Sequence, residues 1–305
     1  MLFLFGPTAV GKTGLLETLA DRPVEVVSAD SMQVYRGMDV GTAKPDPSFR
    51  SRVPHHLIDI RNPDEQYDVG AFVHDADEAI AAIHGRGRVP VVSGGTGYYF
   101  KHLFLGLPES PPSDPAVRAA VRERADREGL SALYAELGRV DPSTAARVGE
   151  NDRYRITRAL EVYEQTGRPL SSFAMVGEPR ADLRVTSVCV TRDREELGVR
   201  IRRRVDEMFA SGLRAEVERL VSAGYGPADP GLRAIGYREF FAEDGAVRPV
   251  GDDGAIAAEI ARNTRRYAKR QETFFRQLPD VTEVRIRDEA IAGIAERLLG
   301  RLDSV

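Results

Sequence analysis

A strand–loop–helix signature at the start of the chain most constrains its fold. The sequence opens MLFLFGPTAVGKTGLL, in which five apolar residues lead into the pattern G-x-x-x-x-G-K-[ST]. A loop of this pattern binds di- or triphosphates, because its backbone N–H groups and the positive end of the following helix face the anion. We expect Lys12 to contact phosphate oxygens and Thr13 to offer a hydroxyl to Mg²⁺. The predicted diphosphate-binding residues are Gly6, Pro7, Thr8, Ala9, Val10, Gly11, Lys12 and Thr13.

Short apolar runs alternate with helical patterns along most of the chain. This alternation predicts an α/β fold, a P-loop NTPase-like parallel sheet with flanking helices. The expected strands span residues 2–5, 25–28, 89–93 and 185–190, with a weaker candidate at 57–60 and a late one at 281–286. The expected helices span residues 12 to about 20, 194–211, 213–223 and 256–277.

A proline-rich segment interrupts this rhythm. Residues 108–115 contain four prolines in eight positions, which neither a helix nor a central strand can accommodate. The pattern from residue 116 to about 167 is helical, and Gly167 and Pro169 form a helix stop. We therefore predict a helical insertion over residues 111–180 within a P-loop α/β core over 1–110 and 181–305.

Composition and charge exclude several classes of protein. The chain has 305 residues and 42% hydrophobic content. Its net charge is −4, so its overall charge does not indicate a nucleic-acid partner. Its one cysteine, Cys189, lies in an apolar run and is expected to be a buried thiol. No stretch approaches the ~20 apolar residues of a membrane span, and no basic residue precedes the opening apolar run. We expect a cytoplasmic protein with no membrane contact.

The aspartate that holds Mg²⁺ in ATP- and GTP-hydrolysing P-loop proteins is missing from its usual place. The strand expected at 89–93 ends in Gly94-Gly95-Thr96-Gly97, without an acid. Asp30 and Asp59 follow only short apolar runs. Asp30 is expected at the carboxyl end of a strand, where ligands bind in such sheets, and could accept a proton from a nucleophile. The alternative for Asp30 is a helix cap or turn acid.

Seven segments, in this order, resemble the tRNA dimethylallyltransferase (tRNA isopentenyltransferase) family of the bacterial type. They are residues 6–13, 30–45, 54–59, 94–100, 151–162, 234–239 and 263–271. The resemblance implies transfer of a dimethylallyl group from dimethylallyl diphosphate to N6 of the adenosine adjacent to the tRNA anticodon (position 37). It also implies that the phosphate loop binds the donor's diphosphate, with Mg²⁺ as cofactor.

The same resemblance implies roles for three catalytic residues. Asp30 matches the family's general base, and Thr13 matches its phosphate and metal contact. Arg204 matches the arginine that grips the diphosphate. Arg204 lies in the run RIRRR at 200–204, and spacing alone does not show which of its four arginines has this role. A solvated helix face is the alternative for Arg204.

A basic helix near the end of the chain suggests contact with RNA. Residues 261–276 hold six basic residues and one acid, and Arg262, Arg266, Lys269, Thr273 and Arg276 share one face. A solvated charged face is the alternative. The resemblance implies tRNA contacts at Arg118, Tyr154, Arg155, Ile156, Thr157, Arg158, Arg233, Gly236, Tyr237, Arg238, Lys269, Arg270, Gln271, Thr273, Phe274 and Arg276. It further implies that Asp30, Ser31, Met32, Gln33 and Thr96 lie near the target base.

Three other functions compete with this interpretation. An isopentenyltransferase acting on free AMP or ATP would have less need of the basic segments and the insertion. A small-molecule P-loop kinase would turn over ATP. A tRNA-binding module with an inactive loop would not need intact Lys12, Thr13 and Asp30.

Phe274 stands where family members often carry Trp, and the chain has no Trp. We expect a monomer, and adjacent His55 and His56 to order the site wall rather than bind a metal.

Overall fold

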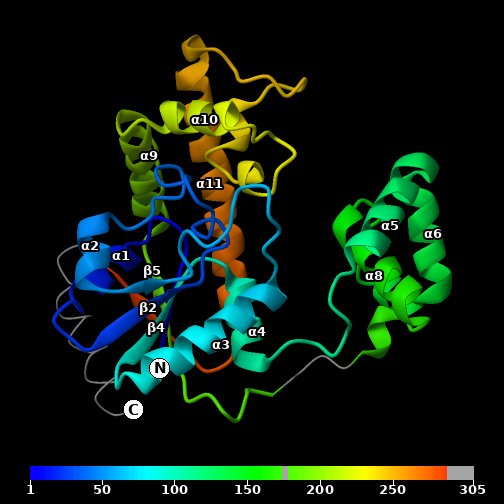
Figure 1. Cartoon of the computed structure of the whole chain (residues 1–305), viewed down its shortest axis with the longest axis horizontal. Coiled ribbons are helices and arrows are strands. Elements are labelled where there is room, and N and C mark those ends of the chain that lie inside the picture. The colour runs from blue at the N-terminus through cyan, green and yellow to red at the C-terminus, as the bar shows by residue number, and fades with distance from the viewer. Residues whose placement is uncertain (174–177, 287–305) are drawn as a thin grey trace. The chain divides into compact units, whose positions relative to one another are not determined.

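The computed structural model describes residues 1–173 and 178–286 (Figure 1). Its contacts divide the chain into two compact units. Among the described residues, the first unit holds 1–104 and 181–286, and the second holds 105–173 and 178–180. The last part of the predicted core, residues 287–305, lies outside the described residues.

The first unit is built on a parallel sheet of six strands. They are β1 (Leu2–Phe5), β2 (Val24–Ser28), β3 (His55–His56), β4 (Val89–Gly94), β5 (Thr186–Thr191) and β6 (Val281–Arg285). Their order is β3-β2-β4-β1-β5-β6, and all pairings are parallel. The α/β prediction is therefore confirmed, including the late strand.

Helices cover both faces of this sheet (Figure 1). The helices of this unit are α1 (Lys12–Glu17), α2 (Pro47–Arg52), α3 (Val69–Gly85), α4 (Gly97–Leu105), α9 (Arg194–Ala210), α10 (Leu213–Ser222) and α11 (Asp253–Phe275), of which α10 packs against α9. Alternate residues of β1 enter different cores, Leu2 and Leu4 on one side and Phe3 and Phe5 on the other. Strands buried on both faces read as continuous apolar runs, which is why the sequence marks them clearly.

Strand order places the functional loops side by side. β1 lies between β4 and β5, and the chain leaves β1 through α1 to reach β2 on the far side of β4. Because every strand runs in the same direction, the loops that follow β1, β2, β4 and β5 leave from one edge of the sheet. Ligands of open parallel sheets bind at this edge, near such a change in strand order.

Two local predictions are wrong. No strand forms at residues 57–60, because Leu57 and Asp59 adopt positive φ values of 63° and 58°, which an extended strand cannot contain. The short strand β3 instead precedes them. The first helix ends at Glu17 rather than near residue 20, because hydrogen bonds from Leu19 N–H to Leu16 and from Ala20 N–H to Glu17 tighten the chain into turns.

The regular elements described in the second unit are all helical. It contains α5 (Pro115–Glu128), α6 (Leu130–Val140), α7 (Pro142–Ala145), α8 (Arg153–Thr166) and the 3₁₀ turn η1 (Leu170–Ser172). Leu133, Leu137, Ile156 and Leu160 are buried in a core of its own. Gly167, in the left-handed region with φ 67°, ends α8 at the predicted helix stop.

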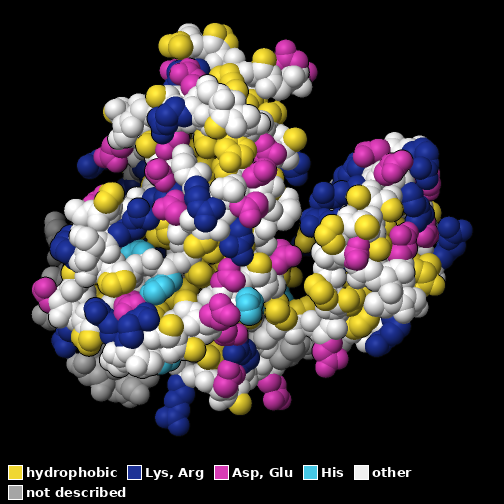
Figure 2. Space-filling view, in the orientation of Figure 1, with side chains coloured by type: hydrophobic (Ala, Val, Ile, Leu, Met, Phe, Trp, Pro, Cys, Tyr) yellow, Lys and Arg dark blue, Asp and Glu magenta, His cyan; other side chains and the backbone are white. Residues whose placement is uncertain are grey.

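The surface carries charges of both signs. Figure 2 shows acidic, basic and apolar side chains interspersed over this face of the molecule. Within residues 1–173 and 178–286, no helix combines the length and apolar content needed to cross a membrane. Cys189 is buried, as predicted, and burial raises the pKa of its thiol to about 12.

Candidate active site

A cavity of about 620 Å³ opens at the carboxyl edge of the sheet in the first unit. The phosphate loop after β1, the segment after β2 and the glycines after β4 line it, together with side chains from α9 and α11. The structure thus brings Lys12, Thr13, Asp30 and Arg204 to one cavity, although up to 192 positions separate them in the sequence.

The phosphate loop is held in a fixed shape by close backbone contacts. A Cβ on Gly6 would lie 2.4 Å from the Val190 carbonyl oxygen, so β5 leaves room only for glycine there. Gly11 begins α1 with φ 111°, a conformation that favours glycine. The Lys12 Nζ atom donates to the carbonyl oxygens of Gly6 and Pro7 at 2.8 and 3.0 Å. Lys12 therefore closes the loop across its base.

The cavity concentrates positive charge. Burial lowers the pKa of Lys12 to about 8, although the nearby Asp30 carboxylate raises it, and Arg204 lowers it further. Burial also lowers the pKa of Arg204, again against the attraction of Asp30. Two cations withdrawn from water gain most from an anionic ligand, because the ligand's charge replaces the solvation they have lost. This combination favours binding of an anion such as diphosphate.

Two arginines that the sequence did not single out support the loop. Arg200 Nε donates to the Ala9 carbonyl at 3.0 Å, and Arg192 Nε donates to the Val10 carbonyl at 3.1 Å. Ala9 has φ 62°, which is uncommon for a residue other than glycine. Arg200 stood in the arginine run without an assigned role, and nothing local in the sequence distinguishes Arg192.

Three arginines of the run at 200–204 reach the cavity. Arg200, Arg203 and Arg204 line it, whereas Arg202 is exposed elsewhere on α9. Arg204 Nη2 donates to the Thr42 carbonyl at 3.5 Å. Burial in this cavity lowers the pKa of Arg204.

Asp30 lies at the end of β2, half-buried on the cavity wall. Its Oδ1 accepts a hydrogen bond from the Met32 N–H at 2.9 Å. The next residue, Ser31, donates its N–H to Thr96 Oγ1 at 3.0 Å, which joins this segment to the loop after β4. Tyr267 of α11 also lines the cavity, and burial raises the pKa of its phenol to about 12. Tyr267 therefore stays neutral beside Asp30.

Gln271 joins α11 to two loops of the cavity. Its Oε1 accepts from the Thr8 N–H at 3.0 Å, and its Nε2 donates to the Gly95 carbonyl at 2.6 Å. The side chain is buried. The tRNA contact expected for Gln271 stays a prediction, and the structure shows its amide bound to the phosphate loop instead of facing solvent.

The predicted basic face of α11 forms on the outside of the helix. Its members, Arg262, Arg266, Lys269, Thr273 and Arg276, are all exposed. Ile260, Ala268 and Phe275 of the same helix are buried. Arg270 is exposed as well and lines the cavity. The neighbouring Phe274 packs on Gly97, where a Cβ would lie 2.4 Å from its ring.

The other predicted tRNA residues differ widely in exposure. In the second unit, Tyr154 is 63% exposed and Arg155 is exposed, but Ile156 and Thr157 are buried. Arg118 and Arg158 are half-buried, and Arg158 pairs with Glu161. In the first unit, Arg233 and Arg238 are exposed, whereas Gly236 and Tyr237 are buried. The buried members Ile156, Thr157, Gly236 and Tyr237 do not present side chains to solvent, whereas the exposed and half-buried members do.

The two adjacent histidines have different partners. His55 lines the cavity, and its Nδ1 lies 2.7 Å from the Val53 carbonyl oxygen. His56 Nε2 lies 2.7 Å from a carboxylate oxygen of Glu25. Within the described part of the chain, no three His, Cys, Asp or Glu side chains gather as a metal site.

Comparisons with known proteins identify the family of this chain. The family model described as IPP transferase matches residues 33–278. The chain is 49% identical to the tRNA dimethylallyltransferase of Methylibium petroleiphilum, over 91% of this chain and 86% of that protein. It is 43% identical to the Geobacter sulfurreducens enzyme of the same name, over 98% and 97%.

Two solved structures share the fold. One is the full-length tRNA isopentenylpyrophosphate transferase from Bacillus halodurans, with 35% identity, a TM-score of 0.66 and coverage of 99% and 96%. The other is a eukaryotic dimethylallyltransferase acting on tRNA, with 27% identity, a TM-score of 0.79 and coverage of 95% and 74%. The chain therefore belongs to the IPP transferase family, the family of the tRNA dimethylallyltransferases.

Proposed function

We propose that the protein transfers the dimethylallyl group of dimethylallyl diphosphate to N6 of the adenosine adjacent to the tRNA anticodon, position 37. The products are N6-(dimethylallyl)adenosine and diphosphate. The observation that carries this proposal is the shared cavity, which joins an intact phosphate loop to Asp30 in a member of this family. Because the acceptor is tRNA, we place the reaction in the cytoplasm.

The donor's diphosphate binds in the phosphate loop. The loop N–H groups, Lys12 and Arg204 surround the leaving group with positive charge. Charge that develops on a leaving group is stabilised best by donors already fixed in place. Arg192 and Arg200 support this role, since they hold the loop carbonyls of Val10 and Ala9.

Thr13 would hold Mg²⁺ together with the donor. Its side chain is exposed in the first turn of α1 and lines the cavity. Mg²⁺ characteristically uses one or two protein groups and takes its other ligands from water and substrate phosphates, so a single hydroxyl fits this ion. When bound, Mg²⁺ would neutralise part of the diphosphate charge.

Asp30 acts as the general base. The adenine amino group is a poor nucleophile, because its lone pair is delocalised into the ring. As the N6–carbon bond forms, the carbon–oxygen bond breaks and its electron pair leaves with diphosphate, while one N6 proton passes to the Asp30 carboxylate. The hydrogen bond from the Met32 N–H to Asp30 Oδ1 holds one oxygen of this carboxylate in place. A positioned base of this kind contributes typically ~10²–10⁴-fold.

The tRNA binds along exposed basic residues of both units. On α11 and its C-terminal cap these are Arg262, Arg266, Lys269 and Arg276, and in the second unit Arg155 and the ring of Tyr154 are both exposed. Lys and Arg side chains neutralise phosphates, whereas aromatic rings stack on unpaired bases. An adenine must leave its stack before its N6 can enter an enclosed cavity, so the target base is flipped out.

The deciding experiment compares the wild type with Asp30→Ala in transfer of labelled dimethylallyl groups to unmodified tRNA. We expect the variant to lose ~10²-fold or more in rate while its tRNA affinity is unchanged. Asp21→Ala is the matched control, because Asp21 is an exposed acid in the turn after α1, and it should react at the wild-type rate. Transfer to AMP, or phosphate transfer from ATP, with none to tRNA would refute the proposal.

A further inference from the structure

A single buried glutamate collects four hydrogen bonds beside the cavity. Glu216 of α10 is 1% exposed. Its Oε2 accepts from the N–H groups of Asp39 and Val40 at 2.9 and 2.8 Å. Its Oε1 accepts from the Gly41 N–H at 3.0 Å and from the Tyr237 hydroxyl at 2.6 Å. One carboxylate thus fixes three consecutive peptide groups of a loop that follows Asp30 in the chain.

The loop also fits closely against the tyrosine ring. A Cβ on Gly41 would lie 2.5 Å from ring atoms of Tyr237, which is completely buried. Gly236, with φ 102°, also approaches Gly41, and a Cβ on Gly236 would lie 3.3 Å from the Gly41 carbonyl oxygen. The Gly41 contact leaves no room for a Cβ, and the positive φ of Gly236 favours glycine, so residues 39–41 fit closely against Tyr237.

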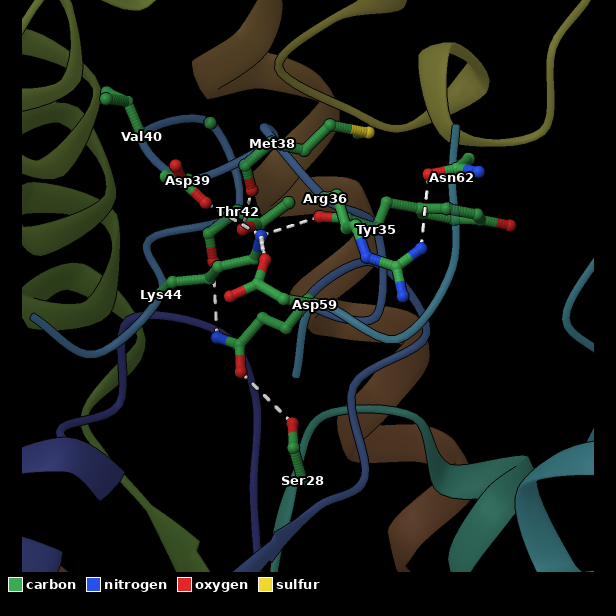
Figure 3. Close-up of polar contacts among 12 residues, drawn as sticks. Ser28, Tyr35, Arg36, Met38, Asp39, Val40, Thr42, Lys44, Asp59 and Asn62 are labelled. Atoms are coloured by element: carbon green, nitrogen blue, oxygen red, sulfur yellow. Dashed lines mark hydrogen bonds and ion pairs between the residues drawn. The ribbon is translucent and has the colours of Figure 1, made fainter. Parts of the chain in front are cut away.

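A buried lysine also contacts this loop (Figure 3). The side chain of Lys44 is 3% exposed, and its Nζ donates to the Tyr35 carbonyl at 2.6 Å and to Asp39 Oδ1 at 2.7 Å. The same ammonium group is paired with Asp59, which also binds Arg50. Glu216 therefore holds residues 39–41, and Lys44 ties the end of the loop back to Tyr35 and Asp39.

Between these anchors, the loop turns two carbonyls toward functional side chains. The Thr42 carbonyl accepts from Arg204 Nη2 at 3.5 Å and from Gln33 Nε2 at 3.4 Å. The Ala43 carbonyl accepts from the same Gln33 amide at 3.4 Å. Gln33 is fixed in turn by Ser28 Oγ, which donates to its Oε1 at 3.1 Å (Figure 3). The Thr42 carbonyl thus links this loop to the Arg204 guanidinium.

We propose that Glu216 and Tyr237 are positioning residues, which hold residues 39–41 so that the Thr42 carbonyl aims Arg204 at the donor's diphosphate. Neither side chain lines the cavity, so both act through the loop. The inference rests on the proposed function, because that function makes Arg204 a diphosphate ligand. It also gives Tyr237 a role inside the protein, whereas the resemblance implies a tRNA contact at this position.

Position 216 requires a carboxylate because four donors share the two oxygens of this side chain. Glutamine at position 216 keeps one acceptor oxygen and replaces the other with an NH₂ donor. Either the Asp39 and Val40 N–H groups or the Gly41 N–H and Tyr237 hydroxyl then lose their acceptor. A buried donor left without a partner is costly, so the loop shifts toward water or toward another acceptor. The Thr42 carbonyl shifts with it.

The test measures binding of inorganic diphosphate with Mg²⁺ by calorimetry, and transfer to tRNA in parallel. We expect Glu216→Gln to weaken diphosphate binding about tenfold and Tyr237→Phe about threefold, since Phe keeps the ring and loses one hydrogen bond. Glu218→Gln is the matched control on the same helix, with a half-exposed carboxylate, and should bind like the wild type. In an Arg204→Ala background, adding Glu216→Gln should weaken diphosphate binding by less than about twofold. The reason is that the effects of residues that act through one group are not additive.

Each result separates the inference from the proposed function. Wild-type diphosphate affinity in Glu216→Gln and Tyr237→Phe overturns the inference, whatever the transfer assay shows. Full tenfold loss in the Arg204→Ala background overturns it as well, since Glu216 would then act without Arg204. A wild type that binds diphosphate but transfers nothing to tRNA counts against the proposed function alone. If circular dichroism shows that the Glu216→Gln protein is unfolded, the diphosphate affinity of Tyr237→Phe decides the question.

Discussion

Replacing Gln271 with leucine tests whether α11 holds the phosphate loop in place. The Gln271 amide accepts from the Thr8 N–H and donates to the Gly95 carbonyl, at 3.0 and 2.6 Å, inside the protein. Gln271→Leu preserves most of the side-chain volume but provides neither contact. The Thr8 N–H and the Gly95 carbonyl are then left inside the protein without their hydrogen bond to position 271.

The size of the effect follows from these two groups. A buried polar group deprived of its partner costs ~1–3 kcal/mol, so two cost about 4 kcal/mol. The greater apolar burial of leucine returns about 1 kcal/mol. We therefore expect Gln271→Leu to lower the free energy of unfolding by about 3 kcal/mol. Because Thr8 belongs to the loop, diphosphate affinity should also fall, by about tenfold.

Urea unfolding followed by circular dichroism measures the first quantity, and calorimetry with inorganic diphosphate measures the second. Gln277→Leu is the matched control, because Gln277 lies just beyond the end of α11 and is exposed. Surface changes of this kind stay within about 0.5 kcal/mol. A Gln271→Leu protein as stable as this control, with wild-type affinity for diphosphate, would refute the reasoning.

Two further predictions concern the ligands. Because burial lowers the pKa of Lys12 to about 8, the free loop loses this charge above that pH. Diphosphate affinity should then fall from about pH 7 to about pH 10, relative to a Lys12→Arg variant whose guanidinium stays charged; parallel profiles would contradict this. Arg155→Gln should weaken tRNA binding and lower the slope of log affinity against log salt by about 1, with diphosphate affinity unchanged. Arg139→Gln, an exposed change in the same unit, should leave the slope as it is.

Local patterns in the sequence were sufficient for much of the architecture. The phosphate loop, the four central strands and the helices at α9, α10 and α11 all follow from apolar runs, glycines and helical periodicity. Asp30 was identified because it directly follows one of these runs. Such features depend on neighbours in the chain, so the sequence displays them directly.

Contacts between distant segments were beyond the reach of the same reasoning. Leu57 and Asp59 sit in an apolar stretch, yet positive φ values exclude the strand expected there. Gln271 and Tyr237 belong to segments that the resemblance connects with tRNA, yet both side chains are buried. Burial is decided by what packs against a residue, and that information is spread over the whole chain.

The sequence by itself determined that this chain builds a parallel sheet with a phosphate loop and a carboxylate at one edge. Only the tertiary structure decided how that edge is assembled. The strand order places β1 between β4 and β5, and this order brings Arg204, Gln271 and Glu216 to the loops at the edge. These contacts depend on distances of about 3 Å between residues far apart in the chain, and no local pattern of residue types encodes such distances.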